Sequence, residues 1–159
     1  SVLTAGNSSS EKVGAAAGVV ISEEMARELG VEPFAHIRAF AIAGADPRQT
    51  YETGPIAVKK VMEKSGLGMD DMDLIEIQEA FAAQVLADLK MLKLTEKDYH
   101  RINVNGSGIS LGHPIACTGT RVLVTLLHEM RRRKSRYGGE SICGGGGLGI
   151  AAIFERRKE

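Results

Sequence analysis

Short apolar runs alternate with amphipathic stretches along most of the chain, a pattern typical of an α/β fold. Continuous or alternating apolar residues predict strands at 15–21, 37–43, 73–78, 102–105, 140–143 and 148–154. Apolar residues at helical spacing predict helices at 23–29, 55–64, 80–92 and 118–134. The elements therefore follow one another in the order βαβαβαβαββ, with no internal repeat or linker between them.

Capping residues support the bounds of these helices. Ser22 precedes the first helix as an N-cap, and Gly30 follows its last residue. Pro55 opens the second helix, where its missing N–H costs nothing, and Gly66 stops it. The helix over 118–134 has the clearest apolar stripe, and small residues near its start predict close packing beneath other layers.

Length and composition place the chain among ordinary globular domains. Its 159 residues suffice for one domain spanning 1–159, with 43% hydrophobic and 25% charged residues. Twenty Lys and Arg balance twenty Asp and Glu, which argues against a nucleic-acid partner. No apolar run is long enough to cross a bilayer, so we expect no membrane partner.

The cysteines and histidines bear on the cellular compartment and on metal binding. Two cysteines, Cys117 and Cys143, do not form a disulfide framework, which favours a reducing compartment. We expect a cytoplasmic protein, with the mitochondrial matrix as the alternative. Four scattered histidines lack the spacing of zinc ligands, so we expect no metal site.

Candidate chemistry gathers in two glycine-rich places. Gly112-His113-Pro114 lies between a predicted strand and a predicted helix, and Cys143 precedes four glycines. An imidazole aimed by a tight turn, and a thiol that substrate can approach closely, suit acyl-thioester chemistry. The alternatives are a histidine in a surface turn and an inert buried cysteine. A phosphate loop is disfavoured, because no Lys-Ser/Thr follows the glycines.

Two further segments carry polar groups with alternative explanations. Gln78, before a predicted helix, either orients a water molecule or caps that helix. The basic run 131–136 either complements the helix dipole or attracts a polyphosphate such as the nucleotide of coenzyme A.

Several motifs, in the same order, resemble those of the thiolase family over nearly the whole chain. They are Thr53-Gly54-Pro55, Glu79-Ala80-Phe81-Ala82-Ala83-Gln84, Asn103-Val104-Asn105-Gly106, Gly112-His113-Pro114 and the block from Cys143 to Gly149. Together they are far more specific than any one alone. The sequence is similar to the C-terminal half of a thiolase.

The resemblance implies a βαβαβαββ half with a five-stranded mixed sheet and helices on both faces. It also implies acyl transfer to coenzyme A through a nucleophilic cysteine, cleaving 3-ketoacyl-CoA or condensing acetyl-CoA, with coenzyme A thioesters as substrates and no bound cofactor. By analogy, His113 donates to a thioester oxygen and helps activate the nucleophile, and Cys143 is the acid/base for the α-carbon. Backbone N–H groups near Gly145 stabilise an oxyanion, and the residues expected to contact substrate are Asn105, Phe81 and Leu148.

Two departures from the family pattern bear on activity. The family's nucleophilic cysteine lies in an N-terminal half that this sequence lacks, and Cys117 does not replace it. We therefore expect a partner, either that half or a separate subunit, an oligomer, and little activity of the chain alone. Gln78 stands where the family has Asn, whose amide holds a catalytic water, and its extra methylene can displace that water.

Two other classes of function are kept open by these departures. A thiolase-like scaffold or acyl-CoA-binding module without catalysis fits the missing nucleophile. A ketoacyl synthase fits less well, because those enzymes use a second histidine where this chain has Cys143.

Overall fold

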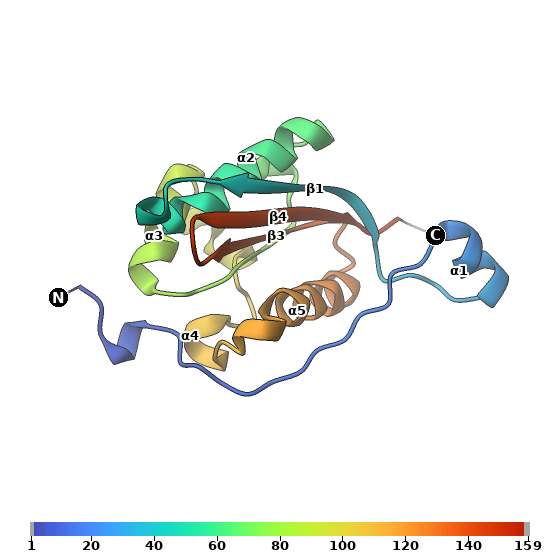
Figure 1. Ribbon diagram of the computed structural model, residues 1–159. Coiled ribbons are helices and arrows are strands. Elements are labelled where there is room, and N and C mark those ends of the chain that lie inside the picture. Colours follow the sequence, from blue (N-terminus) through green and yellow to red (C-terminus); the bar gives the residue numbers. More distant parts are fainter. Residues whose placement is uncertain (1, 158–159) are drawn as a thin grey trace.

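The computed structural model describes residues 2–157. Within this range four strands and five helices follow one another, with short 3₁₀ turns between them (Figure 1). The strands are β1 (His36–Gly44), β2 (Leu74–Ile77), β3 (Tyr137–Gly144) and β4 (Leu148–Glu155). The helices are α1 (Glu23–Leu29), α2 (Thr53–Ser65), α3 (Ala82–Met91), α4 (Gly108–Leu111) and α5 (Thr118–Arg133).

The strands form one mixed sheet in the order β1-β4-β3-β2. β4 is antiparallel to both of its neighbours, while β2 and β3 are parallel. Helix α2 packs on one face and α5 on the other (Figure 1). The predicted α/β class, with a mixed sheet and helices on both faces, is therefore confirmed, but the sheet has four strands rather than five.

The strand expected at 102–105 is reduced to a single parallel bridge between Ile75 and Ile102. Asn103 has a left-handed backbone, with φ of 45°, which turns the chain away from the sheet after one residue. Its side chain continues the ladder, because its Oδ1 accepts from Ile77 N at 2.7 Å and its Nδ2 donates to Ile77 O at 2.9 Å. One amide side chain thus occupies the edge where a fifth strand was expected.

The prediction of a strand at 15–21 is wrong. That segment is extended but belongs to no sheet, and it runs past α5 toward α1 (Figure 1). Val19 and Val20 are 88% and 77% exposed. A run of small and β-branched residues favours extended backbone, yet a strand also needs a partner edge, and no described strand lies alongside it.

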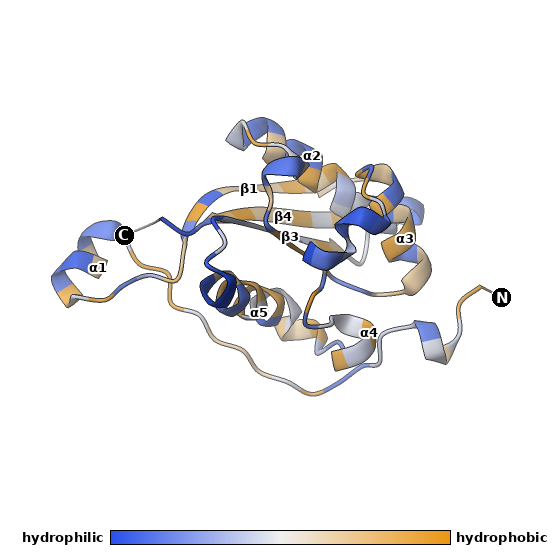
Figure 2. Ribbon diagram, turned by 180° about the vertical axis from the view of Figure 1, so that it is seen from behind, coloured by the Kyte–Doolittle hydropathy of each residue, from blue (hydrophilic) through white to orange (hydrophobic). Residues whose placement is uncertain are grey.

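The core has two parts, one on each face of the sheet (Figure 2). On the α2 face, residues such as Val61, Ile77 and Ile153 are almost completely buried. On the α5 face, Leu126 and Met130 lie over the sheet where Gly138 leaves room, since a Cβ there would come within 2.5 Å of the Met130 sulfur. Close helix packing therefore depends on a glycine at the start of β3.

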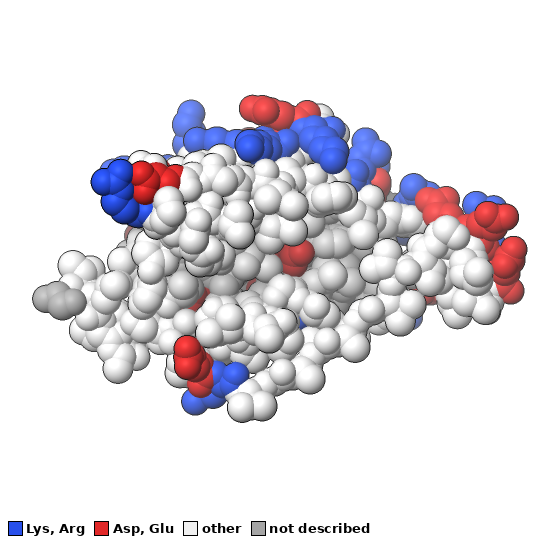
Figure 3. All heavy atoms as spheres, in the orientation of Figure 1, with Lys and Arg blue, Asp and Glu red and all other residues white. Residues whose placement is uncertain are grey.

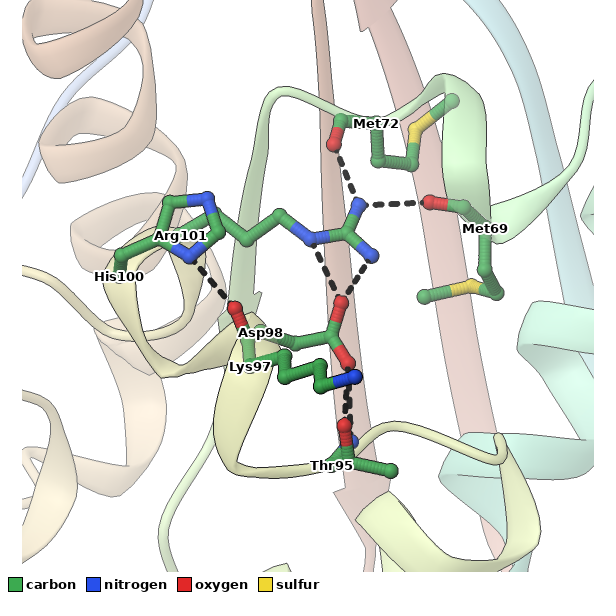
Figure 4. A network of polar contacts seen from close by, with 7 residues as sticks. All are labelled: Met69, Met72, Thr95, Lys97, Asp98, His100 and Arg101. Atoms are coloured by element: carbon green, nitrogen blue, oxygen red, sulfur yellow. Dashed lines mark hydrogen bonds and ion pairs between the residues drawn. The ribbon is translucent and has the colours of Figure 1, made fainter.

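A buried arginine joins the 3₁₀ turn Glu96–Arg101 to the segment before β2 (Figure 4). The guanidinium of Arg101 donates to Met69 O at 2.7 Å, to Met72 O at 2.6 Å and to Asp98 Oδ1 at 2.5 Å. Asp98 in turn accepts from Thr95 N through its other oxygen, at 2.8 Å. This network holds the segment that leads into β2, the strand that Gln78 follows.

Part of the α5 face of the sheet is left uncovered. α5 packs on β2 and β3, so several side chains of β1 and of the first half of β4 on that face are exposed, whereas Ala152 and Phe154 farther along β4 are buried. We call this surface the apolar face; its members are Ile37, Phe40, Ile42, Leu148 and Ile150. In Figure 3 the charged side chains gather over α2 and α1, while the middle of the view carries few of them.

Candidate active site

The predicted catalytic residues lie toward one edge of the sheet, the edge at which the parallel strands β2 and β3 end. β2 and β3 are parallel, so Gln78, just after β2, and Cys143, near the end of β3, reach the same edge. The backbone N of Gln78 donates to Ser141 O at 2.9 Å, which fixes their relative height. The strand ends of open α/β sheets are the usual place for a functional site.

His113 precedes α5, whose first turn lies beside the end of β3, since a Cβ at Gly119 would come 3.4 Å from Ile142 Cδ1. Its backbone N donates to Ser10 O at 2.9 Å, so the N-terminal segment holds it in place. Gly112 precedes it with φ of 97°, and a Cβ at Gly112 would lie 2.4 Å from Lys12 Cγ. Both the backbone conformation and the space therefore require glycine before this histidine.

A hydrogen-bond chain fixes the His113 ring. Thr118 Oγ1 lies 3.0 Å from Pro114 O and 2.7 Å from His113 Nδ1; when its single hydrogen goes to Pro114 O, the hydroxyl accepts from His113 Nδ1. The neutral ring then carries its proton on Nδ1 and presents Nε2 as a base. Burial, and secondarily the positive charge of Arg121, lower the pKa of His113, which favours this neutral form at pH 7.

Cys143 is half-buried on the face of β3 that meets α2. Burial, and secondarily the carboxylate of Asp88, raise the pKa of its thiol to about 11. The resting side chain is therefore a neutral thiol at physiological pH. A group in this state can donate a proton and is a weak nucleophile.

The glycine turn after Cys143 is held at its far end. Gly146 and Gly147 have φ of 81° and 84°, and Gly147 N donates to Thr50 Oγ1 at 3.1 Å. A Cβ at Gly147 would lie 2.3 Å from Ala45 O, so no other residue fits there. Gly145 is exposed at the tip, with open space around it, which leaves its surface accessible to a ligand.

Gln78 is 1% exposed, and neither its Oε1 nor its Nε2 has a hydrogen-bond partner within residues 2–157. Gly108 makes room for the longer side chain, since a Cβ there would come within 2.7 Å of the Gln78 Nε2. A buried amide with a free donor and acceptor is costly unless it binds something. The arrangement fits a side chain that holds a small polar ligand such as water.

The three residues expected to contact substrate are separated. Phe81 packs edge-on against Tyr51, with ring centroids 5.5 Å apart, and Leu148 is exposed beside the glycine turn. Asn105 lies elsewhere, because its Nδ2 donates to Glu129 Oε2 at 3.1 Å. Glu129 follows Thr118 by eleven residues of α5, or about 16 Å along the helix. A groove of about 540 Å³ there is lined by Asn105, Thr125, His128, Glu129, Arg131 and Arg132.

Three acids with raised pKa values, the buried Glu76 and Asp88 and the half-buried Glu140, were not among the predicted site residues. Glu76 and Glu140 are direct partners on β2 and β3, and burial raises their pKa values to about 8 and about 7. Asp88, on α3, is 1% exposed, and burial raises its pKa to about 7. The sequence signal for Asp88 is its position four residues after Gln84, within the otherwise apolar side of a helix.

The described residues offer neither a cluster of metal ligands nor a membrane-spanning helix. Across residues 2–157 no three His, Cys, Asp or Glu side chains gather closely enough to hold a metal ion. None of the helices in the same range combines the length and apolar character that crossing a bilayer requires.

The fold, with Cys143 near the end of β3 and His113 just before α5, defines an α/β domain with a candidate active site at its strand ends. The family model for the C-terminal domain of thiolase matches residues 31–156, and the chain belongs to the thiolase family. It is 47% identical over 155 residues to a 3-ketoacyl-CoA thiolase of Citrobacter koseri. It is 48% identical over 154 residues to an acetyl-CoA acetyltransferase of Syntrophomonas wolfei.

Solved structures agree with this assignment. The crystal structure of human mitochondrial 3-ketoacyl-CoA thiolase in complex with CoA matches 98% of this chain and 39% of its own, with a TM-score of 0.86 and 37% identity. The Bacillus anthracis acetyl-CoA acetyltransferase matches 85% of this chain and 34% of its own, with a TM-score of 0.81 and 47% identity. The match covers 97% of this chain but only 40% of the Citrobacter protein, and 96% but only 38% of the Syntrophomonas protein.

Proposed function

We propose that this chain supplies half of a thiolase active site, which becomes complete when an N-terminal half adds the nucleophilic cysteine. The substrates are coenzyme A thioesters, and the reaction is cleavage of 3-ketoacyl-CoA or its reverse, the condensation of acetyl-CoA. The observation that carries the proposal is the fixed His113 ring, whose Nε2 is kept free by the Thr118 hydrogen bond at 2.7 Å.

His113 has two tasks in this proposal. Its Nε2 takes the proton of the incoming cysteine thiol, which becomes the nucleophile. The imidazolium that results then donates Nε2–H to the thioester oxygen as negative charge develops there. The lowered pKa of His113 favours the first task, because the ring must start neutral.

Cys143 exchanges a proton with the α-carbon. When 3-ketoacyl-CoA is cleaved, the C2–C3 bond breaks and its electron pair goes to C2, while the acyl group stays on the nucleophilic cysteine. C2 takes the proton of the Cys143 thiol and leaves as acetyl-CoA. Cys143 is then a thiolate, which recovers a proton from the thiol of the next coenzyme A. Gln78 orients a water near the oxyanion, and the N–H groups around Gly145 bind the second oxygen.

The apolar face supports an N-terminal partner. Phe40 and Ile42 are 52% and 62% exposed on the part of the α5 face that no described helix covers. Residues 1–30 lie outside the matched C-terminal domain, and the segment 15–21 is extended and exposed. A contiguous apolar surface of this kind is typical of an interface. A cytoplasmic location, with the mitochondrial matrix as the alternative, stays a prediction.

The test is thiolysis of acetoacetyl-CoA by this chain alone and after addition of a thiolase N-terminal half. We expect activity only in the mixture. His113→Ala should lower turnover by about 10²–10⁴-fold, and Cys143→Ala should block condensation while partly sparing acyl transfer. Cys117→Ser is the matched control and should leave turnover unchanged.

Three outcomes would contradict the proposal. Normal turnover of both variants would remove His113 and Cys143 from the site. Activity of the chain alone would mean that the nucleophile lies within it. Binding of acetyl-CoA by the mixture without turnover of acetoacetyl-CoA or a longer 3-ketoacyl-CoA would favour the non-catalytic binding module instead.

A further inference from the structure

Behind Cys143 lies a buried carboxylic acid with no role in the proposed reaction. Asp88 projects from α3 and is 1% exposed. Its Oδ2 accepts a hydrogen bond from Gln84 Nε2, and its Oδ1 has no partner within residues 2–157. An acid in this position costs free energy, since burial disfavours its charged form and half of its carboxylate is unpaired.

Gly54, at the start of α2, shows how close the acid and the cysteine strand are. A Cβ built at Gly54 would lie 2.8 Å from Ser141 Oγ, 3.9 Å from Cys143 N and 4.0 Å from Asp88 Oδ2. The absence of a side chain at Gly54 therefore lets α3 and β3 meet across the end of α2. The carboxylate of Asp88 and the backbone of Cys143 therefore both lie next to this one glycine.

Gln84 holds Asp88 in position. Its Oε1 accepts from the backbone N of Ala80 at 3.0 Å, so its Nε2 is directed along the helix toward Asp88. Gln84 is itself 5% exposed. The amide thus links the first residues of the Ala80-Phe81 segment to the acid, and the carboxylate has little freedom to turn away.

We propose that Asp88 is a positioning residue for Cys143, whose buried carboxylate opposes formation of the thiolate and keeps the thiol as a proton donor. This inference deepens the proposed role of Cys143 and rests on it. A thiol kept neutral is ready to protonate the carbanion released when 3-ketoacyl-CoA is cleaved. The acid thus suits the chain to the cleavage direction, in which Cys143 must begin with its proton.

Of the residues packed around Gly54 next to Cys143, Asp88 is the one that can carry a charge. Its carboxylate is the charge that raises the pKa of Cys143, after burial. The neighbouring residues of α2, β3 and α3 do not titrate; they are Thr53, Gly54, Pro55, Ser141 and Gln84. Glu52, the acid just before α2, is exposed.

The test measures the alkylation rate of Cys143 by iodoacetamide in this chain, in a Cys117→Ser background, between pH 5.5 and 9. It needs neither turnover nor an N-terminal half, so its failure is separate from failure of the proposed function. Asp88→Asn should react faster than its parent above pH 7. Each unit by which the pKa of the thiol falls gives tenfold more thiolate that is about threefold less nucleophilic, for a net gain of about threefold.

The pH dependence separates electrostatics from a loosened structure. Because the pKa of Asp88 is about 7, parent and Asp88→Asn should react alike near pH 5.5, where the acid is neutral, and diverge as it ionises. A variant that only opens the fold would react faster at every pH. Asp70→Asn, an exposed acid, should match the parent throughout.

Two results would overturn the inference: equal rates for Asp88→Asn and its parent across the range, or a gain that is the same at every pH. If circular dichroism shows that Asp88→Asn does not fold, Gln84→Leu takes its place. Gln84 lowers the pKa of Asp88 through its hydrogen bond, so its loss should move the slowing of alkylation to higher pH. An unmoved profile of folded Gln84→Leu would likewise exclude the coupling.

Discussion

His113 Nδ1 and Thr118 Oγ1 lie 2.7 Å apart, and the threonine hydroxyl also lies 3.0 Å from Pro114 O, to which it can donate. This relationship decides which ring nitrogen is the base. It also ties the imidazole to the first turn of α5, whose Gly119 lies beside Ile142 on β3. The position of His113 relative to the cysteine strand therefore depends on one helix terminus.

Thr118→Val should release the ring without changing the shape of the site. We expect the neutral ring to populate both tautomers, measured as a change in the ¹⁵N shifts of His113 Nδ1 and Nε2. Thr125→Val is the matched control, because that hydroxyl donates to Arg121 O on the same helix. Unchanged His113 shifts in Thr118→Val would mean that another group fixes the tautomer.

The Glu76–Glu140 pair should make the chain less stable as the pH rises. The folded pKa of Glu76, about 8, lies above its usual value of about 4.5, so the folded state binds the extra proton. That contribution is complete below about pH 4.5 and is lost as the pH rises through 8. Glu76→Gln stays neutral, so its melting temperature should exceed that of the parent by a margin that widens from pH 5 to pH 8.

Glu63→Gln, an exposed glutamate on α2, is the control for this pH dependence and should track the parent. A margin for Glu76→Gln that stays constant with pH would show that Glu76 is ionised in the fold at pH 5. The positive charge of Arg121, which acts against burial at Glu76, would then be the dominant influence.

Arg101→Met should destabilise the chain by about 2–4 kcal/mol, because it leaves two carbonyl groups and the Asp98 carboxylate without their donor. Urea denaturation measures this as a lower midpoint. Arg48→Met removes an equally short ion pair from the surface, where solvent screens it, and should shift the midpoint far less. Equal shifts for the two variants would show that the buried network in Figure 4 contributes no more to stability than the surface ion pair.

Ile42→Lys places a charge in the middle of the apolar face. We expect less self-association of the chain alone and at least about tenfold weaker binding of a thiolase N-terminal half, since an unpaired lysine is costly to bury. Analytical ultracentrifugation measures both. Leu29→Lys, at a position 61% exposed on α1, is the control. Unaltered binding by Ile42→Lys would place the partner on another surface.

Local sequence signals predicted most of the fold. The helix at 23–29 has its predicted bounds, since Ser22 Oγ accepts from Met25 N at 3.1 Å and Gly30 adopts φ of 62°. The segment 15–21 shows the limit, because its residues favour extended backbone but cannot say whether a partner strand is present. The predicted strand at 102–105 is absent for a different reason. The side chain of Asn103 forms the hydrogen bonds to Ile77 of β2 that a strand backbone would form.

The site was predictable where residues adjacent in sequence act together, as at Gly112-His113-Pro114. The buried acids were not, because their burial depends on elements far apart in the chain. Asp88 is enclosed by the end of α2 and by β3, and Glu76 faces Glu140 from sixty-four positions away. A charge pattern along one helix or strand carries no information about such neighbours.

The amide of Asn103 has a consequence for aggregation. It occupies both the donor and the acceptor of Ile77, and its backbone N donates to Ile75 O at 2.9 Å, so the β2 edge offers few groups to another molecule. The opposite edge, β1, has strand neighbours on one side only. Growth of a fibril needs two open edges per molecule, whereas one open edge ends in a pair. Misassembly of this chain through its sheet should therefore stop at dimers.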